Sequence, residues 1–166
     1  MKSKLKLFFA LIPAMLLLYG CPVGMEHTLG TPGTEKIDKK LLGTWTTTDT
    51  TIEFSKVTIE EKDDYSYTVK VSDRSESYMI DASEFTAWVT TIGENKFIYS
   101  QPTDADDKDY YLYHYKIKGD KLVSQVVSLL VNGSDGVKST EDYRKEVEAS
   151  IKMEGGLSDE LVWERK

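Results

Sequence analysis

Hydrophobic and polar residues alternate along much of this chain, as they do in β-strands that bury one face. The alternation is clearest in residues 64–71, where Tyr65, Tyr67, Val69 and Val71 fall on one side of a strand. Other stretches show it less regularly and are separated by turn-forming residues. The predicted strands span residues 43–48, 51–60, 64–71, 76–82, 85–92, 96–101, 110–118 and 121–130, with a short final strand at 160–164.

One helix is expected near the C-terminus, over residues 140–153. The run Ser-Thr-Glu-Asp at residues 139–142 resembles a capping box, and Tyr143, Val147 and Ile151 recur every four residues on one face. No helices alternate with the strands, which excludes a parallel sheet. The sequence therefore predicts an all-β fold of about eight antiparallel strands, in a barrel or a sandwich, with one C-terminal helix packed outside.

The first 20 residues predict a secretory signal that is cleaved from the mature chain. Residues 1–6 contain three lysines, and residues 7–18 form an apolar run without charge. A helix of that length rises about 18 Å, well short of the roughly 30 Å hydrocarbon core of a membrane. This run is therefore too short for a transmembrane helix.

The leader ends in Leu18-Tyr19-Gly20-Cys21, which resembles the lipobox of bacterial lipoproteins. The resemblance implies cleavage before Cys21 and acylation of its thiol. The alternative is a chance cysteine near an ordinary cleavage site. Cys21 is the only cysteine in the chain, so an internal disulfide is excluded.

Lipidation of Cys21 would attach the protein to a membrane through its N-terminal lipid, because two or three acyl chains anchor a domain stably. In such lipoproteins, Asp after the cysteine marks retention at the inner membrane. Here Pro22 follows, which implies a cell-envelope protein anchored to the outer membrane. Residues 21–36 are expected to comprise the acylated cysteine and a flexible tether, because they are rich in Gly and Pro and show little periodicity. The β domain is then expected at residues 37–166.

Composition and charge narrow the classes of function. The chain has 166 residues, of which 40% are hydrophobic and 30% charged, as expected of one compact domain. Without the three leader lysines, 18 basic and 28 acidic residues remain, a net charge of −10. A surface of that sign repels phosphate backbones, so nucleic acid is not an expected partner.

Gly43-Thr44-Trp45 opens the first predicted strand and Arg165 lies close to the C-terminus, and together with the strand pattern these residues resemble the lipocalin or wider calycin barrel. The resemblance implies that Gly43, Trp45 and Arg165 are structural, with Trp45 plugging one end of the barrel and the Arg165 guanidinium lying over the indole. The sequence departs from the lipocalin pattern because its arginine follows the helix. A core tryptophan of a β-sandwich is the alternative.

Tyrosines alternate along residues 110–118, and they are the main candidates for ligand contact. Tyr67, Tyr111, Tyr113 and Tyr115 would give a barrel lumen an apolar wall with polar tips, suited to a small apolar or amphiphilic molecule. The alternative is that these rings fill a solid core. In that case the domain would act as a protein-interaction module in the envelope, with a partner that the sequence does not identify.

No combination of residues predicts catalysis. His114 is the sole histidine of the predicted domain, and no nucleophile and base can be paired, so the protein is not expected to be an enzyme. Neither the two histidines nor the aspartates at residues 104–109 have the spacing of a zinc or calcium site. No metal or other cofactor is predicted.

Overall fold

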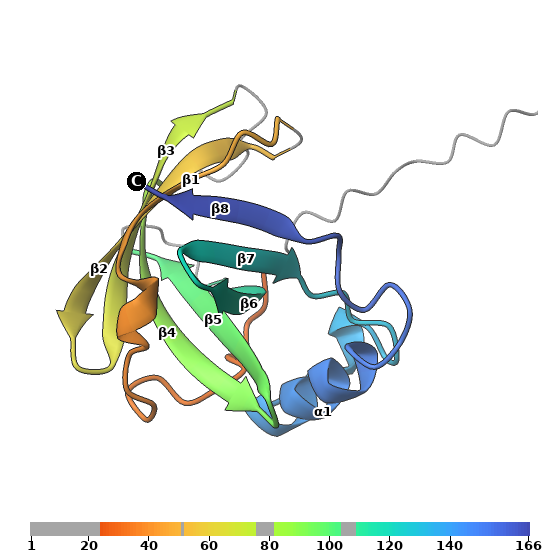
Figure 1. The fold of residues 1–166 in the computed structure, drawn as a ribbon. Helices are drawn as coiled ribbons and strands as arrows, with labels where there is room; N and C mark the ends of the chain where they lie inside the picture. Colours follow the sequence, from red (N-terminus) through yellow and green to blue (C-terminus); the bar gives the residue numbers. More distant parts are fainter. Residues whose placement is uncertain (1–23, 51, 76–81, 104–108) are drawn as a thin grey trace, which may run out of the picture.

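The computed structural model describes residues 24–50, 52–75, 82–103 and 109–166. Eight antiparallel strands follow one another around a closed barrel, and β8 pairs with β1 to close it (Figure 1). This confirms the predicted all-β fold and selects the barrel over the sandwich. The strands are β1 (Gly43–Thr46), β2 (Phe54–Asp63), β3 (Ser66–Arg74), β4 (Glu84–Ile92), β5 (Asn95–Pro102), β6 (Tyr111–Lys118), β7 (Lys121–Val126) and β8 (Leu161–Arg165).

Two predicted strands differ from this arrangement. The strand expected at residues 76–82 falls almost wholly outside the described residues. The one expected at 121–130 ends at Val126. Val127 then makes an isolated bridge to Leu157, and Leu129 packs against a second hydrophobic cluster outside the barrel.

Side chains of the barrel form two separate cores. The inner core fills the closed end of the lumen and contains Trp45, Tyr67 and Tyr115. The outer core lies between the outer face of the β4–β6 wall and the segments that cover it; it comprises Met25, Leu29, Ile92, Phe97, Tyr99, Leu112, Tyr143 and Val147. Strands of this wall are therefore buried on both faces, which explains their nearly continuous hydrophobic sequence.

Helix α1 (Thr140–Ser150) lies outside the barrel (Figure 1), which confirms the predicted C-terminal helix. The Ser139 hydroxyl accepts a hydrogen bond from the Asp142 amide at 3.1 Å, as an N-cap does. Tyr143 and Val147 are buried against the outer core. No helix among the described residues has both the length and the apolarity to cross a membrane.

Residues 24–30, part of the predicted tether, pack against the outside of the barrel. The backbones of Met25 and Tyr110 exchange two hydrogen bonds, of 3.0 and 2.9 Å. Leu29 is fully buried. Further along, a Glu35 carboxylate oxygen accepts a hydrogen bond from the Thr90 hydroxyl at 2.6 Å. The packed part of the chain therefore begins ahead of Ile37, where composition alone suggested a flexible linker.

Two short 3₁₀ helices complete the fold: η1 (Lys39–Leu41) and η2 (Ser134–Gly136). Helix η1 lies across one end of the barrel, just before β1, and Leu41 points into the lumen. This end is called the closed end below. The opposite end, where β4 begins and β5 ends, is called the mouth.

Candidate functional site: a cavity in the barrel

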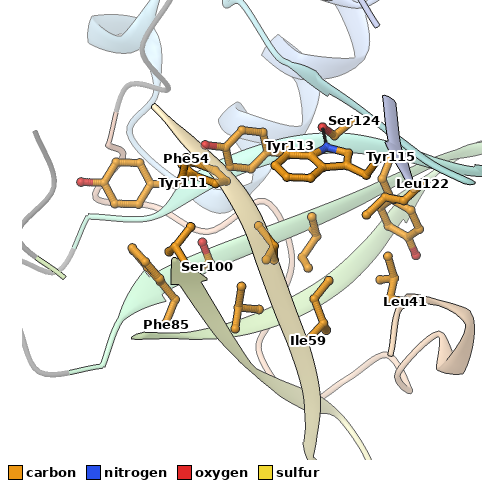
Figure 2. A pocket seen from close by; sticks show the side chains of 15 residues that line it. Leu41, Phe54, Ile59, Phe85, Ser100, Tyr111, Tyr113, Tyr115, Leu122 and Ser124 are labelled. Atoms are coloured by element: carbon orange, nitrogen blue, oxygen red, sulfur yellow. Dashed lines mark hydrogen bonds between the residues drawn. The ribbon is translucent and has the colours of Figure 1, made fainter. Parts of the chain in front are cut away.

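A cavity of about 120 Å³ lies inside the barrel (Figure 2). Helix η1 and strands β2 to β8 contribute its wall, and none of the lining side chains carries a formal charge. The lining residues are Leu41, Phe54, Val57, Ile59, Val69, Val71, Phe85, Ile98, Ser100, Tyr111, Tyr113, Tyr115, Leu122, Ser124 and Trp163.

The distribution of large and small side chains along the wall leaves this space. Ser100 of β5 and Ser124 of β7 are the shortest side chains that line it. The Ser124 hydroxyl accepts a hydrogen bond of 2.9 Å from the Trp163 indole, which satisfies the indole N–H inside the barrel. The remaining lining residues are aliphatic or aromatic, so the cavity is mainly apolar.

Aromatic rings gather toward the mouth of the cavity. Phe54 stacks on Trp163 with ring centroids 5.8 Å apart, and Phe85 meets Tyr111 edge-on at 6.3 Å. Figure 2 shows Phe85 and Tyr111 at one end of the cavity and Leu41 at the other. These ring pairs offer flat apolar surfaces on which a guest ring can pack.

Burial of the lining residues shows which end is open. Leu41 is 1% exposed and Tyr115 2%, so the floor at η1 is sealed. Phe54, Tyr111 and Tyr113 point inward from the strands yet are only half-buried. The cavity is therefore accessible to solvent from the mouth.

Gly43, Trp45 and Arg165, which the resemblance to calycins singles out, come together at the closed end. Trp45 is fully buried and donates its indole N–H to the Leu41 carbonyl at 2.8 Å. The Arg165 guanidinium carbon lies 4.2 Å from the centre of the Trp45 ring. Arg165 also donates hydrogen bonds to the carbonyls of Leu42 and Lys40, so it ties the C-terminal strand to η1.

Gly43 is required at its position for two reasons. Its φ of +126° lies in the region that residues with side chains rarely adopt. A Cβ atom there would also lie 2.7 Å from the Arg165 guanidinium. The glycine therefore lets Arg165 approach the backbone as β1 begins.

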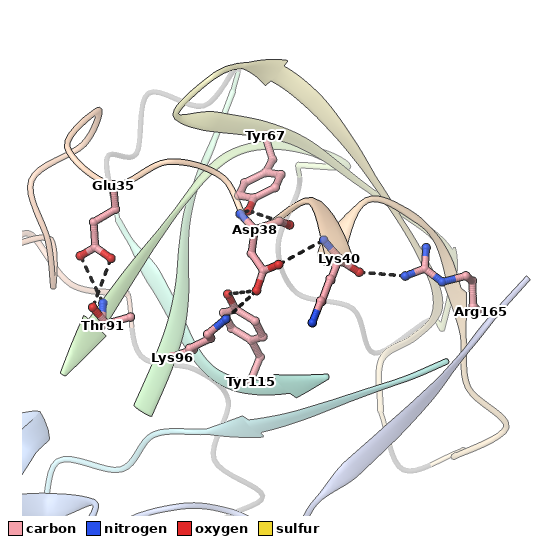
Figure 3. Close-up of polar contacts among 8 residues, drawn as sticks. All are labelled: Glu35, Asp38, Lys40, Tyr67, Thr91, Lys96, Tyr115 and Arg165. Atoms are coloured by element: carbon pink, nitrogen blue, oxygen red, sulfur yellow. Dashed lines mark hydrogen bonds and ion pairs between the residues drawn. The ribbon is translucent and has the colours of Figure 1, made fainter. Parts of the chain in front are cut away.

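A polar cluster around Asp38 seals the floor (Figure 3). The Asp38 carboxylate accepts hydrogen bonds from Lys96 at 2.8 Å, the Lys40 amide at 3.1 Å and the Tyr115 hydroxyl at 3.4 Å. Although burial raises the pKa of Asp38, the hydrogen bonds from Lys96 and Lys40 outweigh it and lower that pKa below its usual value. Burial raises the pKa of the Tyr115 phenol, so Tyr115 remains a neutral donor.

Three of the four predicted ligand-contacting tyrosines, Tyr111, Tyr113 and Tyr115, line the cavity. Tyr67 does not line it. That side chain is fully buried at the closed end, where its hydroxyl accepts a hydrogen bond of 2.6 Å from the Asp38 amide. Tyr67 therefore belongs to the inner core at the closed end and is bonded to the segment that forms the floor.

Several lining residues were missed at the sequence level. Val69 and Val71 share the alternation that identified Tyr67, so extension of the same pattern would have found them. Phe54 belongs to the alternating stretch at residues 51–60, but nothing in the sequence places it beside Trp163. They meet only because the barrel closes, which brings the first residue of β2 against the last strand.

His114 lies outside the cavity, in the wall that faces the outer core. It is 1% exposed, contacts the Phe97 ring edge-on at 5.4 Å, and its Nε2 has no hydrogen-bond partner among the described residues. Burial and the nearby Lys116 lower the pKa of His114, against the opposing hydrogen bond with Gln125. Within the described ranges, His, Cys, Asp and Glu side chains form no cluster that could hold a metal ion.

Fold and cavity define a closed antiparallel barrel with an internal apolar pocket that opens at one end. No protein-family model matches this chain, and no match was found among curated proteins or solved structures.

Proposed function

We propose that the barrel binds a small, uncharged apolar molecule, or the apolar part of an amphiphile, without catalysing a reaction. The observation that carries this proposal is the 120 Å³ cavity lined only by uncharged side chains. A solid interaction module would instead need inward rings that interdigitate. Phe85 and Tyr113 line open space, and Phe97 packs in the outer core.

The chemistry of the wall favours an uncharged guest. A charged group that moves from water into such a lumen loses its hydration, and the wall offers no opposite charge to replace it. This costs several kcal/mol. The lining hydroxyls are those of Ser100, Ser124 and three tyrosines. They can orient a neutral polar group through single hydrogen bonds without compensating a full charge.

The cavity volume limits what fits wholly inside. An apolar protein cavity of about 150 Å³ is known to hold benzene, so a volume of about 120 Å³ suits one small ring or a short branched hydrocarbon. A longer amphiphile would leave its polar end at the mouth. We propose no catalysis because no histidine, carboxylate or lysine is among the side chains that line the described wall, and the Asp38 carboxylate that meets Tyr115 lies at the sealed floor.

We further propose that the domain is a bacterial lipoprotein of the cell envelope, anchored through acylated Cys21. The lipobox-like sequence that ends in Cys21 supports this part of the proposal. Pro22, rather than Asp, favours the outer membrane. No protein partner is proposed.

The binding proposal is tested by filling the cavity. Ser100→Phe adds a phenyl ring to the lumen, whereas Ser72→Phe makes the same change on the outer face of β3, opposite to Val69 and Val71. Toluene is expected to raise the melting temperature of the wild type and of Ser72→Phe, and to bind at least about tenfold more weakly to Ser100→Phe. Circular dichroism checks that both variants are folded.

Benzoate provides the test of charge, because it adds a carboxylate to the same ring. It is expected to give no stabilisation at the concentrations where toluene stabilises. Native mass spectrometry of protein from the source cell would show whether a neutral molecule co-purifies. Equal toluene binding by the two serine variants, or benzoate binding as tight as that of toluene, would refute the proposal.

A further inference from the structure

The segment that connects the anchor to the barrel has a fixed direction. Met25 pairs with Tyr110, and the next residue, Tyr111, lines the mouth of the cavity against Phe85. At its other end, the Ile37 amide donates to the Asp64 carbonyl at 3.1 Å, in the β2–β3 turn of the closed end. The segment therefore runs down the outside of the barrel from the mouth to the closed end.

Close packing holds the first part of this segment, residues 24–30, against the barrel. A Cβ atom on Gly24 would lie 2.4 Å from the Asp109 side chain, and one on Gly30 would lie 2.8 Å from Thr90. Met25 is 5% exposed and Leu29 is fully buried. Arg144 of α1 donates a hydrogen bond to the Leu29 carbonyl at 3.1 Å, so the segment is also bonded to the helix. Gly24 therefore lies directly against Asp109, next to the start of β6.

The chain length between the proposed anchor and this fixed point is short. Cys21 and Gly24 are three residues apart, so their Cα atoms are at most about 11 Å apart even in a fully extended chain. Strand β6 has 8 residues, and a strand of that length spans roughly 26 Å. A lipid attached to Cys21 thus lies much nearer to the mouth than to the closed end.

We propose that the mouth of the cavity faces the membrane surface in which Cys21 is anchored, so that the cavity opens toward molecules dissolved in the bilayer. The inference rests on the proposed function, both on the lipid at Cys21 and on the apolar cavity. The chemical class of the ligand follows: a neutral apolar molecule that partitions into lipid and reaches the cavity without crossing bulk water. The surface that meets the bilayer is the rim formed by the strand ends near Phe54, Phe85 and Tyr111.

Charge attraction does not account for this orientation. The mature chain carries a net charge of −10, and anionic lipids repel such a surface. The short covalent connection sets the orientation instead. The arrangement is therefore expected in neutral vesicles and is expected to be insensitive to salt.

Fluorescent labels at the two ends of one strand test the orientation. Thr103, just after β5, lies at the mouth, and Glu94, just before β5, lies at the closed end; both are exposed. Because Cys21 is the sole cysteine and is acylated, Thr103→Cys and Glu94→Cys each give a uniquely labelled protein. The acylated full-length proteins are reconstituted in phosphatidylcholine vesicles that contain lipids with nitroxide headgroups.

The label at position 103 is expected to be quenched several-fold more than the label at position 94. A matched variant carries a Gly-Ser insertion of about twelve residues between Val23 and Gly24, long enough to let the barrel turn. In that variant the two labels are expected to be quenched to a similar degree. Equal quenching in the protein of natural length, or stronger quenching at position 94, would overturn the inference.

Failure of the orientation is distinguishable from failure of the proposed function. If the protein with Cys21 does not join the vesicles, or if Cys21→Ser joins them equally well, the anchor is refuted and the orientation with it. If the vesicles hold the protein but quenching is equal at both ends, only the orientation is refuted. The toluene titration of Ser100→Phe needs no membrane, so it tests the cavity separately.

Discussion

Leu29 tests whether residues 24–36 belong to the fold. Its side chain is fully buried in the outer core, next to residues of α1 such as Val147. Leu29→Ala removes three carbon groups, which are worth about 2.4 kcal/mol at about 0.8 kcal/mol each. The space left behind adds to this, and comparable substitutions cost about 2–5 kcal/mol. If Leu29 lay in a flexible tether, its replacement by alanine would leave the free energy of unfolding almost unchanged.

Urea unfolding of the chain from residue 22 onward, followed by tryptophan fluorescence, measures this difference in the free energy of unfolding. In a protein of this size, each kcal/mol also lowers the melting temperature by about 2–4 °C. Thr31→Ala is the matched control, because Thr31 belongs to the same segment and is exposed.

The control is expected to change the unfolding free energy by less than about 0.5 kcal/mol. If Leu29→Ala also stays within that range, the segment does not pack as the structure shows. In that case Gly24 would not be held at a fixed point beside the mouth.

Two further predictions concern the closed end and the outer wall. Arg165→Leu should lower the free energy of unfolding by about 1–3 kcal/mol, because it removes the cation over Trp45 and the donors to two carbonyls. Urea unfolding measures this loss, and toluene titration should show that the variant still binds toluene. A loss of toluene binding as large as that of Ser100→Phe would contradict a purely structural role for Arg165. Since burial lowers the pKa of His114 below 6.5, only the unfolded chain gains this proton as the pH falls below that value, and stability drops. As the pH is lowered from about 7.5 to 5.5, the wild type should therefore lose more unfolding free energy than His114→Phe does. If the difference between the two proteins does not change with pH, the pKa of His114 is the same in the folded and unfolded chain.

Period-two alternation predicted a strand at the position of each of the eight barrel strands, because one face of each strand in an antiparallel barrel points toward the core. It extended β7 too far, and its strand at residues 76–82 lies almost wholly outside the described residues. It also placed Tyr111, Tyr113 and Tyr115 on one face, and all three line the cavity. Alternation does not show which face is inside when both are apolar. In β5, Phe97 and Tyr99 face the outer core while Ile98 and Ser100 face the lumen.

The tether and the cavity required three-dimensional information. Glycine and proline around Leu29 indicate a coil, and a coil that packs against a barrel wall has the same composition as one that does not. Burial of Met25 and Leu29 depends on a groove made by α1 and the β4–β6 wall, far away in the sequence. The cavity volume depends in turn on the register of every strand around the barrel.

The outer core provides a physical reason why the barrel can keep a cavity. At about 24 cal/mol per Å³, a cavity of 120 Å³ costs about 3 kcal/mol relative to a filled lumen. Full burial of an aliphatic side chain contributes about 1.5–3 kcal/mol, so Leu29 and Val147 together offset that cost. Burial outside the wall thus supplies stability comparable to what the unfilled part of the lumen forgoes. The space beside the mouth is left unfilled, and the same segment that carries part of this outer core fixes where the described chain begins at Gly24.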